Sequence, residues 1–345
     1  MAPTADRPLL DEAAAVRAAS LVAPARRSTP AAVAELRAAV LADLPQVDAA
    51  ARAWTQLGAE LPPTTVRVVG RTGWVRANVA ALQGAFEPLR DKLERRGRVA
   101  SSALGTQIGA LLGLLSTKVL GQYILPLAGP GQGQLVVVGP NVLDLAEEFG
   151  PLADDIRRTV MLHEVTHRLQ FDATPWLGDH LRGLLSRYLE DARVDPAALA
   201  EAAPRLPQAL AAAREQGELE PLLKVVLTED QAAVVREAQG LMSLLEGHGT
   251  TAMYEAAPTD LIGDTDGVRE ALASRQGDVT SKILTAVAGM EMKRRQYREG
   301  EAFVREVVEQ RGVAGLNRAF DAPEHLPRAD EVQDPAAWLA RVTAA

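Results

Sequence analysis

Apolar side chains recur along most of the chain at a spacing near 3.6 residues, which is the repeat of an α-helix. Most of these positions hold Ala or Leu, which favour helix over strand. Strand patterns are limited to VRVV at 66–69 and QLVVV at 134–138. We therefore predict a mainly α-helical fold with a small β element. The predicted helices span 11–22, 31–57, 76–95, 99–117, 152–171, 175–194 and 228–255, with one or two more within 267–312.

Glycine and proline divide these elements. Gly70 and Gly73 predict a turn after the first strand, and Gly139 with Pro140 closes the second. The tail from residue 322 is rich in Pro and Asp and is expected to wrap over the surface. Since no repeat or linker is apparent, we expect a single domain over 1–345. It would divide at most into two lobes, about 1–172 and 173–345.

The segment 99–117 contains no charge, and Gly105, Gly109 and Gly113 recur at every fourth position. In a bilayer this stripe would be a helix-packing face. In a soluble protein it would let another backbone approach a buried helix. We favour the soluble interpretation, because Ser, Thr and Gln dilute a run that should hold about 20 mainly apolar residues to span a membrane.

Composition and net charge limit the possible partners, metal ligands and location of the protein. The net charge of −8 gives no support to a nucleic-acid partner or an anionic membrane surface. Cysteine is absent, so a zinc site could use only His, Asp or Glu. The first 27 residues carry charges every few positions and lack the apolar core of a secretion signal, so we expect a cytoplasmic protein.

The candidate chemistry lies in VMLHEVTHRLQF, residues 160–171. Residues four apart share one face of a helix, so His163 and His167 can aim their imidazoles at one metal ion. Glu164 lies beside that face and could take the proton of an activated water without binding the metal. The alternative is a solvated helix face. The surrounding apolar residues argue against it, because buried imidazoles and carboxylates need partners.

A zinc site needs a third ligand. The peptidases that supply it just beyond the motif require a glycine where Gln170 stands and a His or Asp where Ala173 stands, so that class does not fit. The other class uses a glutamate from a later helix. Glu246 is favoured because 239–254 is otherwise uncharged, and a lone buried carboxylate is costly unless it is paired or bound to a cation. The competing candidates are Glu190, among charges, and Glu229, near a helix start.

Three further residues are candidates for contacting substrate or the developing oxyanion. His248 follows Glu246 by two positions, about 200° around a helix, so it reaches the same site only if Gly247 or Gly249 distorts the helix. The equal alternative is a histidine satisfied by a local hydrogen bond. Tyr254 and Tyr297 are the other oxyanion candidates.

Longer blocks of sequence make the motif more specific. HEVTHRLQF, PWLGDHLRGLL, MSLLEGH and QYREGEAFV, with GWVRANV and VLGQY upstream, resemble a family of uncharacterised zincin-like metallopeptidases of actinobacteria and related bacteria. Genome context associates that family with deazaflavin coenzyme biosynthesis. The resemblance extends from about Gly73 to beyond Val304. It implies a helical zincin-like fold, zinc ligands His163, His167 and Glu246, and Glu164 as the base. It departs from the family at Thr250, where an Asp often stands.

We therefore expect a zinc-dependent hydrolase, in the first place a metallopeptidase acting on a peptide or protein. The alternative is a non-catalytic protein with a structural or partner-binding metal site. The intact Glu164 favours the enzyme, because structural zinc needs no base. Zincins commonly hold a peptide against an edge strand before the motif helix. QLVVV is in the right order for that role, although its unbroken apolar run fits a buried core strand equally well.

Overall fold

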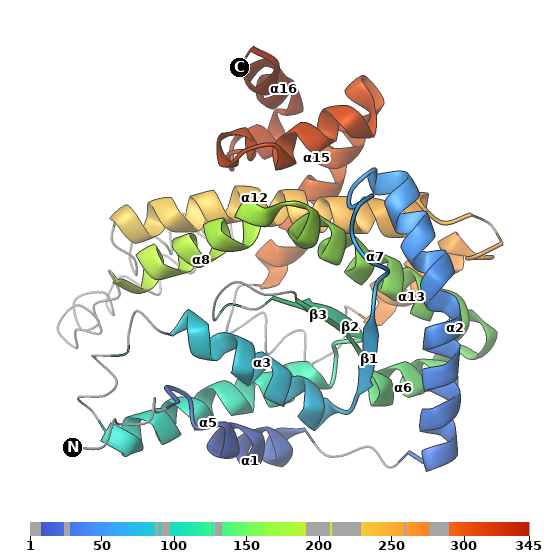
Figure 1. Ribbon diagram of the computed structural model, residues 1–345, viewed down its shortest axis with the longest axis vertical. Coiled ribbons are helices and arrows are strands. Elements are labelled where there is room, and N and C mark those ends of the chain that lie inside the picture. Colours follow the sequence, from blue (N-terminus) through green and yellow to red (C-terminus); the bar gives the residue numbers. More distant parts are fainter. Residues whose placement is uncertain are drawn as a thin grey trace. The chain divides into compact units, whose positions relative to one another are not determined.

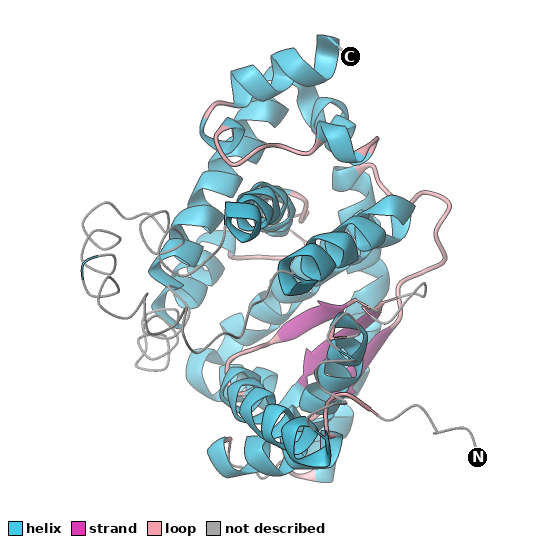
Figure 2. Ribbon diagram, turned by 90° about the vertical axis from the view of Figure 1, so that its left-hand side faces the viewer, coloured by secondary structure: helices cyan, strands magenta, loops and turns pink. Residues whose placement is uncertain are grey.

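The computed structural model describes residues 8–23, 28–86, 90, 97–125, 127, 133–190, 208, 229–258, 260–275 and 290–344. The prediction of a mainly helical fold with a small β element is confirmed (Figures 1 and 2). The chain forms two compact units, Met1–Gly178 with Ala252–Leu272, and Asp179–Thr251 with Ala273–Ala345. The single domain with lobes dividing near residue 172 stays a prediction.

The first unit contains a three-stranded sheet and most of the N-terminal helices. Its elements are α1 (Glu12–Val22), α2 (Pro30–Thr55), β1 (Val66–Val69), α3 (Arg71–Ala85), α5 (Gly97–Ser116), β2 (Gly121–Ile124), β3 (Gln134–Val138), α6 (Gly139–Phe149), α7 (Ala153–Ala173) and most of α13 (Thr265–Arg275).

The second unit is helical among its described residues. Helices α8 (Pro175–Glu190) and α12 (Glu229–Glu255) cross from one unit to the other. The rest consists of α15 (Met290–Asn317), three short 3-10 turns and α16 (Pro335–Ala344). The tail therefore does more than wrap the surface, because α16 inserts a completely buried Trp338 whose indole N–H donates to the carbonyl of His325.

The sheet order is β1-β3-β2, with β3 parallel to β1 and antiparallel to β2. Strand β3 is buried on both faces. Leu135 and Val137 pack in the cluster that includes α2, α6 and α7, while Val136 and Val138 pack in the cluster that includes α1, α3 and α5. This explains the unbroken apolar run of QLVVV. Of its two interpretations the core strand is correct. The edge strands are β1 and β2, and the sequence pattern did not predict β2.

The region around Gly70 differs from the predicted turn. Gly70 is the extended N-cap residue of α3, which begins at Arg71, so Gly73 lies inside a helix that was expected to begin only at Arg76. Helix α6 begins at Gly139, where Gly139 and Pro140 are expected only to close the strand, so the sequence pattern does not predict this helix. Proline fits the first turn of a helix, where its missing N–H costs no intrahelical bond.

The glycine stripe of α5 faces α1. A Cβ added at Gly105, Gly109 or Gly113 would lie 2.1–2.6 Å from backbone atoms of Asp11, Ala15 or Ala19. Only glycine permits this backbone approach, which confirms the stripe as packing inside the protein. Among the described residues, no helix is long and apolar enough to cross a membrane.

Candidate metal centre

Helix α7 fixes the motif in the core of the first unit. Its buried face carries Met161, Leu162, Val165 and Leu169, each no more than 1% exposed. That packing sets the rotation of the helix, and so the direction of the polar residues between these positions.

The two motif histidines converge. Nε2 of His163 and Nε2 of His167 lie 3.0 Å apart, with ring planes at 85°. Two nitrogens that bind one zinc ion at about 2.0–2.1 Å with a tetrahedral angle lie about 3.3 Å apart. The pair therefore fits two ligands of a single metal ion.

Gln170 orients His167. Its side chain is completely buried, and Oε1 lies 2.9 Å from Nδ1 of His167. Since Oε1 can only accept, Nδ1 carries the ring proton and Nε2 presents a lone pair, which is the tautomer that a metal requires. In the sequence alone, Gln170 is a mismatch to another peptidase class and has no predicted role. Its position three residues after His167, on the same helical face, was the signal for this role.

Glu164 is held by strand β2. The main-chain N–H of Tyr123 donates to Oε2 of Glu164 over 2.8 Å. Gly121 eases this approach, because a Cβ there would lie 3.0 Å from Cγ of Glu164 and 3.1 Å from Cγ1 of Val160, and both side chains would have to shift. The carboxylate thus lies along the sheet edge with one oxygen engaged by the strand.

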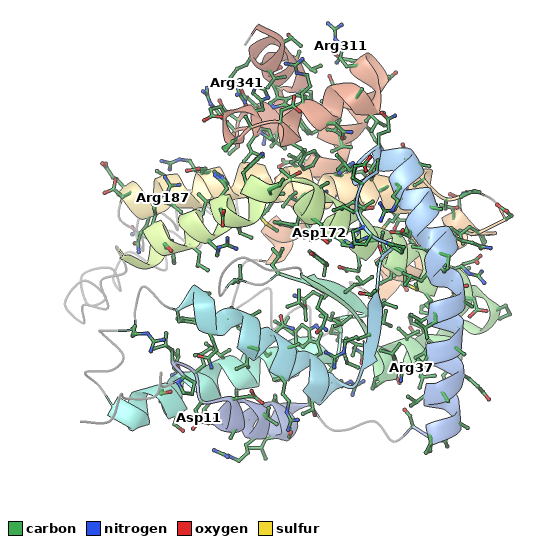
Figure 3. All side chains as sticks on the ribbon, viewed as in Figure 1. Asp11, Arg37, Asp172, Arg187, Arg311 and Arg341 are labelled. Atoms are coloured by element: carbon green, nitrogen blue, oxygen red, sulfur yellow. The ribbon has the colours of Figure 1, made fainter. Side chains whose placement is uncertain are left out.

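A buried polar network surrounds the C-terminal end of α7. Asp172 is labelled in Figure 3. It accepts from the phenol of Tyr123 at 2.5 Å through Oδ1 and from Arg168 Nε at 3.1 Å through Oδ2. Arg168 also donates to Thr64 Oγ1 and to the carbonyl of Pro62, and Thr64 donates to Asp48. Burial, with the neighbouring Asp172 carboxylate, raises the pKa of Tyr123 far above its ordinary value, so the phenol remains a hydrogen-bond donor. Asp172 is thereby committed to this network.

In the second unit, helices α12 and α15 cross closely. A Cβ at Gly247 would lie 2.2 Å from the carbonyl oxygen of Gly300, and one at Gly300 would lie 2.2 Å from that of Ser243. Only glycine at positions 247 and 300 permits this close approach. Glu246 itself is half-buried on α12.

The remaining candidate residues, for contacting substrate or for the third metal ligand, differ in their burial and in their contacts. His248 is completely buried, with its ring 5.7 Å from that of Phe320, and α12 continues as one helix through Gly247 and Gly249. The distortion that would turn His248 to the side of Glu246 is not found in that helix. The guanidinium carbon of Arg269 lies over the ring of Tyr254, 3.7 Å from the ring centroid. Glu229 is exposed at the start of α12. The side chains of Tyr297 and Glu190 lie outside the described residues.

His163, His167 and Glu246 are the group of described residues whose side chains could hold a metal ion together. A model of the zincin-like metallopeptidase family matches residues 11–339, nearly the whole chain. The chain belongs to the zincin-like metallopeptidase family. The family predicted from the sequence blocks is therefore confirmed at this level, and the two histidines plus a distal glutamate match the ligand set it implied.

Among solved structures, this zincin-like chain is similar to a crystal structure from Chloroflexus aurantiacus, described as a candidate hydrolase with a novel fold. The two share 28% sequence identity with a TM-score of 0.70, over 97% of this chain and 99% of the other. No curated protein matches the sequence of this zincin-like chain.

Proposed function

We propose that the protein is a zinc-dependent metallopeptidase, with zinc held by His163, His167 and Glu246 and with Glu164 as the general base. The observation that carries the proposal is the placing of Glu164. It directly follows a candidate ligand and is bound through one oxygen to the edge strand β2. A structural metal site would need no carboxylate in that position.

Zinc and the protein side chains would have different roles in catalysis. Zinc, when bound, would act as a Lewis acid that makes water a nucleophile near neutral pH. Glu164 would take the proton of the attacking water on Oε1 and deliver it to the leaving amine. Gln170 keeps His167 in the tautomer that presents Nε2. The candidates for the oxyanion-stabilising group are Tyr254 and Tyr297, because α12 lacks the distortion that would turn His248 to the side of Glu246.

The expected substrate is an extended peptide laid along β2 rather than β3. The N–H of Val138 donates to the carbonyl of Leu120, and residue 122 pairs with residue 136. Main-chain groups alternate along a strand, so those of Gly121 and Tyr123 point away from β3, as the Tyr123–Glu164 bond also indicates. A peptide on this edge would have to pair through main-chain groups other than the Tyr123 N–H, which binds Glu164. We also retain the expectations of a cytoplasmic location and no nucleic-acid partner.

Substitution of the base tests the proposal. Protein purified without chelator should contain about one zinc per chain. In a peptide-library assay, Glu164→Gln should keep zinc and thermal stability while losing turnover by about 100- to 10,000-fold, because a general base contributes on that scale. Glu35→Gln, on an exposed face of α2, is the matched control and should retain full turnover. Full turnover in zinc-loaded Glu164→Gln would refute the mechanism.

If the wild-type protein binds zinc but cleaves no peptide in the library, the non-catalytic alternative is favoured. A thermal midpoint that falls in Glu164→Gln, with turnover unchanged, would instead identify Glu164 as a structural partner of β2.

A further inference from the structure

The hydrogen bond between Glu164 and Tyr123 joins the proposed base to the backbone of a strand. A carboxylate at the end of a free side chain samples several rotamers, whereas one oxygen bound at 2.8 Å to a main-chain N–H restricts them. With Oε2 bound to the strand, the position of Oε1 follows from the position of β2. The precision of the base therefore depends on what holds that strand.

The side chain of Tyr123 holds it. Its phenol donates to Asp172 at 2.5 Å and accepts from the N–H of Gly133 at 3.0 Å. A Cβ at Gly133 would lie 2.3 Å from Cζ of the tyrosine, so the ring fills the space that a side chain there would need. The ring also stacks on Phe171, with centroids 6.3 Å apart.

Tyr123 thus contacts α7 at two points. Glu164 and Asp172 are eight residues apart, which is about 12 Å along a helix axis. The main chain of Tyr123 binds the first and its phenol binds the second. Asp172 cannot turn away easily, because its other oxygen accepts from Arg168.

We propose that Tyr123 is a positioning residue for Glu164, with its phenol clamping β2 to the end of α7 so that its own N–H holds the carboxylate of the base. This inference rests on the proposed function for its catalytic consequence. The contact itself does not require activity to be measured.

The opposite face of β2 offers a matched control. The side chain of Gln122 exchanges two hydrogen bonds with the buried Asn78 of α3, at 3.1 and 3.2 Å. Asn78→Ala removes those bonds and the bond from Asn78 to the carbonyl of Trp74. Tyr123→Phe removes the two bonds of the phenol. Both variants loosen β2, but only the second releases the clamp on the side of Glu164.

The experiment compares these variants in zinc-loaded, full-length protein. Tyr123→Phe should lower kcat by about 10- to 100-fold with KM nearly unchanged, because displacement of a reacting group by about 1 Å can cost 100-fold. Hydrogen exchange at the Tyr123 amide should accelerate in the same variant. Asn78→Ala should lower thermal stability while keeping kcat and slow exchange at Tyr123. Unchanged kcat in Tyr123→Phe, or an equal loss of kcat in Asn78→Ala, would overturn the positioning role.

Variants of Glu164 separate this inference from the proposed function. Exchange of the Tyr123 amide should be slow in the wild type and in Glu164→Gln, whose side-chain carbonyl still accepts, and fast in Glu164→Ala. If no peptide is cleaved, the proposed function fails while these exchange rates still decide the contact. Equal exchange rates of the Tyr123 amide in all three proteins would refute the contact between Tyr123 and Glu164.

Discussion

Helices α5 and α7 are nearly equal in length, at 20 and 21 residues, but the first unit uses them differently. In α5 the charge-free stretch that begins at residue 99 brings glycine backbone against α1, and the neighbouring polar groups bond locally, as Ser116 does to the carbonyl of Gly113. In α7 polar side chains are buried among apolar ones and bond to partners outside their own helical turn. An uncharged pattern is thus accounted for by packing alone. Buried polar side chains that orient one another through hydrogen bonds, as in α7, indicate a functional site.

The largest effect expected from this contrast concerns the third ligand. Glu246→Ala should lower zinc affinity by more than about 100-fold, exceeding the 10- to 100-fold loss typical of an outer hydrogen-bond partner. Glu190→Ala should leave zinc affinity unchanged. Titration with a zinc indicator measures both. If Glu190→Ala lowers zinc affinity and Glu246→Ala does not, Glu246 is not the third zinc ligand.

A smaller effect is expected at Gln170. Gln170→Leu keeps a buried side chain of similar size but leaves Nδ1 of His167 without its acceptor. Zinc affinity should fall by about 10- to 100-fold, since outer partners of ligating histidines contribute on that scale. Gln170→Glu, which restores an acceptor oxygen, is the matched control and should recover most of the affinity. Unchanged zinc binding in Gln170→Leu would reduce Gln170 to a packing residue, like those of α5.

The smallest effect on zinc binding is expected from a substitution in α5. Gly109→Leu would place a side chain into the backbone of Ala15 and should lower the free energy of unfolding by about 1–3 kcal/mol, the usual range for overpacking. Zinc content should not change. Gln107→Leu, at an exposed position of the same helix, is the control. Denaturant unfolding compares the two, and equal stability would remove the packing explanation for the stripe.

Local patterns made much of the fold predictable. The strand VRVV, the motif helix and the glycine stripe each depend on residues close together in sequence, and the structure places them where the pattern indicates. The family could also be predicted, because blocks of several residues around His163 and Glu246 are far more specific than a motif of three residues.

The partners of the site could not be predicted in the same way. Tyr123 lies on a four-residue strand containing Gly121 and Gln122, too short and too polar to show alternation. Its bond to Glu164 depends on the pairing of β2 with β3 and on the packing of α7 against that edge, which no local pattern encodes. Gln170 is different, since its spacing from His167 was visible in the sequence.

The mixed pairing of the sheet has a consequence for how this site assembles. Strands β2 and β3 are joined by residues 125–133, whereas β1 must bring residue 66 to residue 135 across a stretch that includes α3, α5 and β2. Closing a short loop costs less chain entropy than closing a long one, so hairpins can form early and distant parallel pairs late. We expect the hairpin that carries Tyr123 to precede the docking of β1. The strand that holds the base would then belong to the early folding nucleus, and substitutions in β1 would mainly speed unfolding rather than slow folding.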